Sequence, residues 1–233
     1  MPGDPQRDLP FSDRRQAGRV LAQQLRPYAD CSDVIVLALP RGGVPIGYEV
    51  AAALGADLDI FLVRKLGLPG HPEYAMGAIA TGGIRVLNED AIGWYHVAED
   101  VVEAVVASET RELQRRETAF RDGRAAAPIA GRTAIIVDDG LATGSSMRAA
   151  VTAVRRLTPS RLVVAVPVGA SATCRKLQSI ADEVVCAYTP EPFSAVGQWY
   201  RDFSQTDDDE VQSLLRAHAA SPRHRVRPIQ RAL

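Results

Sequence analysis

Short, continuous runs of apolar residues alternate with helix-like segments along this chain of 233 residues, and they limit its fold more than any other feature. The clearest runs are VIVLAL (34–39), the end of TAIIV (133–137) and most of RLVVAVPV (161–168). An uninterrupted apolar run is expected where both faces of a strand are covered. Between the runs, apolar residues recur at steps of three and four, as in amphipathic helices. The alternation therefore predicts an α/β fold with a mostly parallel sheet and helices on both faces.

The same patterns predict the individual elements and one domain. We expect residues 1–220 to form a single domain with a small irregular hood at about 190–205, and residues 221–233 to be a disordered basic tail. A Gly- and Pro-rich stretch, 66–83, is predicted to be irregular, and so is the loop 40–47. The predicted strands span 34–39, 59–65, 84–88, 133–137, 161–168 and 182–188. The predicted helices span 14–28, 48–55, 99–120, 146–157, 171–181 and 207–220.

The composition excludes several functional classes. Lysine and arginine number 27 against 28 acids, and this balance disfavours a generally basic nucleic-acid-binding protein. The longest apolar runs are strand-sized, far short of the roughly 18 residues of a membrane helix. The N-terminus lacks a basic-then-apolar signal pattern, and the three cysteines form neither a disulfide framework nor a zinc motif. We therefore expect a soluble cytoplasmic protein.

One loop carries the strongest chemical signal. The segment 138–146, DDGLATGSS, lies between an apolar strand and a predicted helix. Its small residues allow successive backbone N–H groups to converge on one anion, at a position where the positive end of the helix dipole also points. Asp138 and Asp139 cannot bind phosphate themselves, but they suit hydroxyl groups or a Mg²⁺ ion. A phosphate next to paired hydroxyls describes a ribose 5-phosphate.

In its apolar strand, two acids and small Thr-Gly loop, the chain resembles the type I phosphoribosyltransferases. The resemblance implies that Asp138 and Asp139 hold the ribose 2- and 3-hydroxyls of phosphoribosyl pyrophosphate, and Mg²⁺ directly or through water. It implies that residues 141–145 hold the 5-phosphate. Ala142 stands where some purine-using members carry an acid, as it does in adenine- and uracil-using members. The implied substrate-binding residues of this loop are Asp138, Asp139, Gly140, Leu141, Ala142, Thr143, Gly144, Ser145 and Ser146.

Two further loops match the family by position. The loop 39–47 follows the strand 34–39, and by resemblance Arg41, Gly42 and Gly43 grip the pyrophosphate. The Gly pair also permits a close backbone approach that other residues would forbid.

The second of these loops, 63–79, follows the next predicted strand. By resemblance it corresponds to a mobile loop that closes over the substrates. At its root, Arg64 and Lys65 are the implied catalytic residues that contribute positive charge to the leaving pyrophosphate. Glu73 is implied as a proton donor or acceptor for the base. Because glycines and prolines recur from Leu66 to Ala78, we expect this loop to form no stable strand and to be poorly ordered without ligand.

An aromatic segment, 192–203, resembles the hood that covers the base in this family. Trp199 is the implied base contact, while packing is the expected role of most of the other aromatic residues. On the long predicted helix, Glu112 and Arg116 are spaced as an i,i+4 ion pair.

The implied reaction is transfer of the 5-phosphoribosyl group to a nitrogenous base with release of pyrophosphate, in nucleotide metabolism and salvage. The implied partners are phosphoribosyl pyrophosphate, Mg²⁺, a nucleobase or nucleoside monophosphate, and a second copy of the chain in a homodimer. Neither a membrane nor nucleic acid is expected as a partner. A regulatory protein of the same fold that senses such ligands is the alternative. An unrelated phosphate-ester hydrolase is disfavoured, because no water-activating histidine or dense acid cluster accompanies Asp138. The sequence leaves the acceptor base open.

Overall fold

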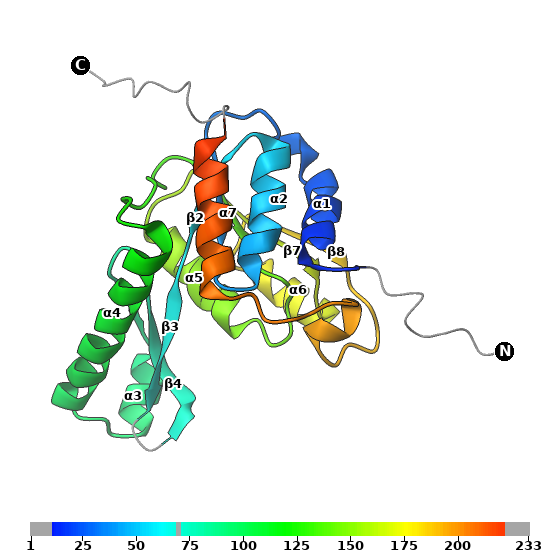
Figure 1. Cartoon of the computed structure of the whole chain (residues 1–233). Helices are drawn as coiled ribbons and strands as arrows, with labels where there is room; N and C mark the ends of the chain where they lie inside the picture. Colours follow the sequence, from blue (N-terminus) through cyan, green and yellow to red (C-terminus); the bar gives the residue numbers. More distant parts are fainter. Residues whose placement is uncertain (1–10, 69–70, 222–233) are drawn as a thin grey trace.

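A five-stranded parallel sheet forms the centre of the molecule in the computed structural model, which describes residues 11–68 and 71–221 (Figure 1). The strand order is β2-β1-β6-β7-β8, and every neighbouring pair is parallel. This sheet confirms the predicted parallel α/β architecture. Its strands are β1 (Val34–Ala38), β2 (Asp57–Ile60), β6 (Thr133–Val137), β7 (Arg161–Val168) and β8 (Glu183–Tyr188).

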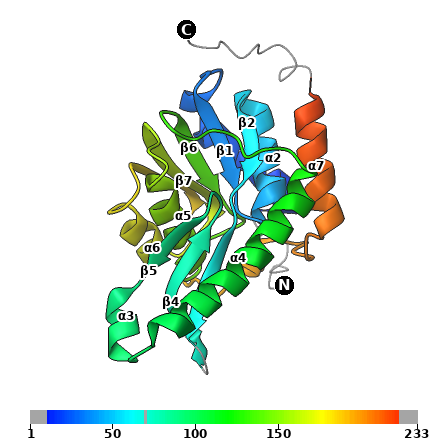
Figure 2. The same ribbon diagram turned by 90° about the vertical axis from the view of Figure 1, so that its left-hand side faces the viewer.

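Helices cover both faces of this sheet, as Figure 2 shows. Successive residues of a strand point to opposite faces, so β1 contributes Val34, Val36 and Ala38 to one core and Ile35 and Leu37 to the other. The first core lies under α1 (Arg14–Gln24), α2 (Gly43–Leu54) and α7 (Asp208–Ala220), and a short 3₁₀ turn, η1 (Arg26–Tyr28), follows α1. The second core lies under α5 (Ser145–Arg155) and α6 (Ser171–Leu177).

A second, antiparallel sheet projects from the main body together with two helices (Figures 1 and 2). We call residues 63–121 the arm. Asn88 caps the first helix of the arm, since its side chain accepts a 3.2 Å hydrogen bond from the Ala91 amide. The arm comprises β3 (Val63–Leu68), β4 (His71–Ala80), β5 (Ile84–Leu87), α3 (Glu89–Trp94) and α4 (Glu99–Arg121).

The arm shows that two predictions were wrong. The expected strand 59–65 is divided, because β2 ends at Ile60 in the main sheet and β3 begins at Val63 in the other. The loop expected to be poorly ordered, from Leu66 to Ala78, belongs mostly to the β3–β4 hairpin. Its glycines fit this hairpin because the ladder changes register around Gly67, and a Cβ at Gly77 would lie only 2.4 Å from the Val86 carbonyl oxygen. Cross-strand pairing thus overrides a composition typical of loops.

Helix α2 also differs from its prediction. It begins at Gly43, five residues before the expected start, and includes most of the predicted loop 40–47. Val44 and Ile46 are fully buried in the core, so tertiary packing favours the early start. Pro45 stands in the first turn, where the missing N–H costs no intrahelical hydrogen bond.

The described part of the chain ends at Ser221, one residue after α7. The predicted tail therefore lies outside the described residues, apart from that serine. Among the residues that are described, no helix combines the length and apolar character needed to cross a membrane.

Candidate functional site

The candidate site lies where two neighbouring parallel strands, β1 and β6, end. The loops that follow them touch, since the Leu39 amide donates a 2.9 Å hydrogen bond to the Val137 carbonyl. A Cβ at Gly42 would lie 2.1 Å from Oδ2 of Asp139, and one at Gly43 would lie 2.8 Å from the Val137 carbonyl oxygen. The glycine pair is therefore required for the predicted pyrophosphate loop to approach the acidic pair.

The phosphate loop, residues 138–146, keeps the backbone amides of its second half available. Within the described structure, no acceptor lies in hydrogen-bonding distance of the amides of residues 142–146. Gly144 adopts φ +73°, a left-handed conformation that turns the chain into α5. The hydroxyls of Thr143 and Ser145 lie 2.8 Å apart at the same turn. Amides and hydroxyls without carbonyl partners form the kind of concave donor set that binds an anion.

The underside of the phosphate loop is fixed to the rest of the protein. The Leu141 amide donates to the Val168 carbonyl at 2.9 Å, and the Ala170 amide donates to the Leu141 carbonyl at 2.8 Å. The side chain of Leu141 is buried in the second core. Leu141 was predicted to help hold the 5-phosphate, but its amide is already used and its position is that of an anchor.

The two carboxylates at the start of the loop are partly buried and destabilise each other's charge. Burial raises the pKa of Asp138 well above its usual range, and the negative charge of Asp139 raises it further. Burial also raises the pKa of Asp139, although the guanidinium of Arg14 opposes that shift. The Asp139 amide donates a 2.9 Å hydrogen bond to Oδ1 of Asp138. Such a pair favours a bound hydroxyl or cation that relieves its repulsion.

Arg14, at the start of α1, joins the acidic pair to the hood. Its Nε donates to Oδ2 of Asp139 at 2.9 Å, and its Nη1 donates to the Ser204 carbonyl at 2.6 Å. Its guanidinium also lies 3.9 Å from the centre of the Phe203 ring. The hydroxyl of Tyr200 donates to the Asp139 carbonyl at 2.6 Å. Sequence reasoning missed Arg14, because nothing in its local pattern relates it to a loop 125 residues away.

The hood packs directly on the phosphate loop. Its 3₁₀ turn, η2 (Val196–Trp199), brings the Val196 side chain against Gly140. A Cβ at Gly140 would lie only 2.5 Å from Cγ1 of Val196. Trp199 is half-buried and stacks on Phe193, with ring centroids 6.4 Å apart at 17°. The Trp199 Nε1 is buried, and no acceptor in the described structure bonds to it. The contact of Trp199 with a base therefore stays a prediction.

A small cleft faces Asp138, and we call it the arginine cleft. It has a volume of about 130 Å³ and brings together Arg41 from the β1 loop, Arg64 from β3 and Arg116 from α4. Ser146 of the phosphate loop lies at the same cleft. Its complete lining is Leu39, Pro40, Arg41, Phe61, Leu62, Val63, Arg64, Arg116, Phe120, Asp138 and Ser146.

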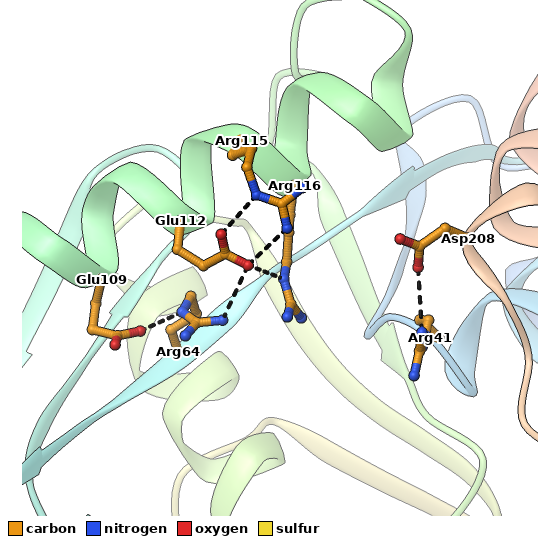
Figure 3. A network of polar contacts seen from close by, with 7 residues as sticks. All are labelled: Arg41, Arg64, Glu109, Glu112, Arg115, Arg116 and Asp208. Atoms are coloured by element: carbon orange, nitrogen blue, oxygen red, sulfur yellow. Dashed lines mark hydrogen bonds and ion pairs between the residues drawn. The ribbon is translucent and has the colours of Figure 1, made fainter.

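Acidic residues of α4 position two of these arginines, as Figure 3 shows. Arg64 donates through Nε to Glu109, and its Nη1 lies 3.9 Å from Oε1 of Glu112. That same oxygen accepts a 2.8 Å hydrogen bond from Nε of Arg116, while Arg115 donates to both oxygens of Glu112, at 2.7 and 3.0 Å. Hydrogen bonds from Arg115 and Arg116 lower the pKa of Glu112 to about 2, so it remains ionised at neutral pH. The third arginine, Arg41, forms a looser pair with Asp208 at 3.4 Å.

The predicted catalytic residues do not all meet at the cleft. Lys65 is exposed on β3, and as the neighbour of Arg64 it points to the opposite face of the strand. It does not line the cleft as described. Glu73 lies on β4, but its side chain is outside the described part of the structure. Arg116 was missed as a site residue: the i,i+4 spacing predicts its pair with Glu112, but not that α4 lies over the cleft.

Comparison with known proteins agrees with this geometry. The family model for the phosphoribosyl transferase domain matches residues 13–197. Curated relatives in two strains of Mycobacterium tuberculosis, named provisionally as phosphoribosyl transferases, are 49% identical over 209 residues, which is 89% of this chain and 47% of theirs. The chain thus spans about half the length of these relatives. The crystal structure of TT1426 from Thermus thermophilus is 42% identical, covers 88% of this chain and 97% of its own, and superposes with a TM-score of 0.78. The chain belongs to the phosphoribosyl transferase family.

Proposed function

We propose that this protein transfers the 5-phosphoribosyl group of phosphoribosyl pyrophosphate to a nitrogenous base and releases pyrophosphate. The observation that carries the proposal is one juxtaposition. Backbone amides without acceptors, at residues 142–146, follow the partly buried pair Asp138 and Asp139 along the loop, and the arginine cleft faces Asp138. Three kinds of donor and acceptor therefore stand in the order in which phosphoribosyl pyrophosphate presents its phosphate, hydroxyls and pyrophosphate.

Each part of the site has a separate task in this proposal. The amides of residues 142–146, with the hydroxyls of the loop, donate to the 5-phosphate. Asp138 accepts hydrogen bonds from the ribose hydroxyls, while Asp139 is held by Arg14 and shapes the loop. The arginine cleft receives the pyrophosphate, whose charge matches the forked donors of guanidinium groups.

The chemistry demands placement more than covalent assistance from the protein. The bond from ribose C1 to the pyrophosphate oxygen breaks, and a bond from C1 to a nitrogen of the base forms. Negative charge grows on the departing pyrophosphate, and fixed cations stabilise it most when they need no rearrangement. Glu109 and Glu112 hold Arg64 and Arg116 in place before the ligand arrives. The apolar walls of the cleft, Phe61 and Leu62 among them, limit the access of water to C1.

The acidic pair also fits the predicted Mg²⁺ ion. Mg²⁺ keeps several waters and binds through one or two carboxylates together with substrate phosphates, so it needs no dense cluster of ligands. Groups of three or more metal-ligating side chains are absent from the described residues, and this pair suits an ion that arrives with its substrate. Asp138 would hold it, and when bound it supplies positive charge to the pyrophosphate oxygens.

A panel of purine and pyrimidine bases tests the proposal. We expect at least one base to yield its nucleoside 5-monophosphate and pyrophosphate when the protein is incubated with phosphoribosyl pyrophosphate and Mg²⁺. Mass spectrometry of the product gives the readout, and chelation of Mg²⁺ provides the control. Binding of phosphoribosyl pyrophosphate without turnover of any base would favour a ligand-sensing regulator and contradict the proposal.

A further inference from the structure

Two of the three cysteines lie close together, one on α6 and one on β8. The sulfurs of Cys174 and Cys186 lie against the same residue, Gly169, and the thiol of Cys186 donates a 3.3 Å hydrogen bond to the Tyr188 carbonyl. Gly169 leaves the space that both sulfurs occupy, because a Cβ there would lie 3.0 Å from Sγ of Cys174 and 3.2 Å from Sγ of Cys186. A side chain at position 169 would press against both sulfurs. The pair is therefore built by the backbone of this segment.

The thiol pair lies directly beside the phosphate loop. Gly169 forms a parallel bridge with Leu141, and the same hypothetical Cβ would lie 3.0 Å from the Cβ of Leu141. Thr173, next to Cys174 in α6, donates a 2.7 Å hydrogen bond to the Ala142 carbonyl. Its methyl carbon would lie only 2.6 Å from a Cβ at Gly144. A shift of α6 at Cys174 would therefore move Thr173, which contacts the phosphate loop.

The two sulfurs differ in environment. The neighbouring thiol of Cys186 lowers the pKa of the Cys174 thiol, and the neighbouring Cys174 together with burial raises the pKa of Cys186. Cys174 is 6% exposed, and Cys186 is only partly buried, so the pair lies close to the surface. Within the described residues, no third metal-ligating side chain joins them. The arrangement is that of a nucleophilic thiol beside a resolving one, rather than that of a metal site.

We propose that Cys174 and Cys186 form a reversible disulfide under hydroperoxide, and that this bond weakens ligand binding at the phosphate loop. The Cys174 thiolate attacks the outer peroxide oxygen, the O–O bond breaks, and the departing alkoxide or hydroxide takes a proton. The Cys186 sulfur then attacks the sulfenic acid of Cys174 and expels water. Two thiols lose two electrons in total, and the hydroperoxide gains them.

Formation of the bond moves the loop support. Bonded sulfurs are about 2.05 Å apart, much closer than two unbonded sulfurs can lie, so formation of the disulfide draws Cys174 and Cys186 toward each other. Thr173 moves with Cys174, and its hydrogen bond to the Ala142 carbonyl is strained or lost. This half of the inference rests on the proposed function. Loss of one such hydrogen bond predicts about tenfold weaker binding of phosphoribosyl pyrophosphate.

The test uses the full chain with Cys31→Ser, which removes the remaining cysteine. After treatment with hydrogen peroxide, we expect a mass loss of about 2 Da and a cross-linked Cys174–Cys186 peptide. Calorimetry with phosphoribosyl pyrophosphate and Mg²⁺ should show the weaker binding, and dithiothreitol should restore it. In the matched Cys31→Ser/Cys186→Ser variant, oxidation should stop at a sulfenic acid that dimedone traps at Cys174.

Two results would overturn the inference. Absence of the cross-linked peptide contradicts the dithiol, and a disulfide that leaves the affinity unchanged contradicts its coupling to the loop. If the reduced protein does not bind phosphoribosyl pyrophosphate, the proposed function fails together with the coupling. The mass measurement still decides the disulfide in that case, so the two failures are distinguishable.

Discussion

Replacing Asp138 with asparagine is expected to raise the melting temperature of the protein while lowering its turnover by about 100- to 1,000-fold. Burial and the charge of Asp139 raise the pKa of Asp138, so ionisation of this carboxyl destabilises the folded state at neutral pH. Asparagine removes that charge and retains an oxygen that can accept the 2.9 Å hydrogen bond from the Asp139 amide. It loses the charge that orients the ribose hydroxyls and attracts the cation.

The pH dependence of this effect has a definite sign. Because the folded pKa lies above the unfolded value of about 3.9, the folded state holds the proton more tightly, and stability falls as pH rises through this window. The advantage of the variant should therefore be about 1–3 kcal/mol near pH 7.5 and should shrink toward pH 4.

Urea unfolding at several pH values measures this advantage. Asp182→Asn is the matched control, because a hydrogen bond from Arg155 lowers the pKa of Asp182 and the same substitution should there destabilise the protein. Equal destabilisation by both variants would show that ionised Asp138 does not destabilise the folded state.

Replacing Arg116 with methionine is expected to lower turnover by about 30- to 1,000-fold, corresponding to about 2–4 kcal/mol of transition-state stabilisation. Methionine keeps much of the length of the side chain and removes the cation that lines the arginine cleft. Because charge on the pyrophosphate grows during bond breaking, kcat should fall more than the affinity for phosphoribosyl pyrophosphate.

Arg115→Met is the matched control for this prediction. Arg115 precedes Arg116 on α4 and binds the same partner, Glu112, but it does not line the described cleft. Its loss should change kcat by less than about threefold, as expected for an exposed ion pair. Steady-state pyrophosphate release from both variants gives the comparison. Equal kcat values for the two variants would exclude Arg116 from the reaction.

The sequence predicts those parts of the molecule whose signal is local. The runs at 133–137 and 161–168 match β6 and β7 residue for residue, because buried parallel strands must be apolar on both faces. The acids and small residues of the loop 138–146 are contiguous, so their place between β6 and α5 is likewise predictable. The prediction failed in the β3–β4 hairpin, where cross-strand pairing, which no local pattern encodes, organises glycines typical of a loop.

The site residues that sequence reasoning missed depend on long-range packing. Arg14 reaches Asp139 only because α1 packs beside α2, and Arg116 reaches the cleft only because α4 packs on β3. Locally, each is an arginine on an amphipathic helix, a pattern typical of a solvated face. Lys65 shows the converse, since its position beside Arg64 suggested the site while the period of the strand turns it away.

The location of the 5-phosphate is the central claim, and backbone amide NMR of the full chain tests it most directly. Titration with ribose 5-phosphate, which lacks the pyrophosphate, should shift the amides of residues 142–146 first and most strongly, since they have no acceptor in the described structure. The Leu141 amide, which already donates to the Val168 carbonyl, should shift less. Saturating shifts confined to this loop and the neighbouring Asp138 would agree with the account. Absence of shifts there, with binding detected elsewhere in the protein, would contradict it.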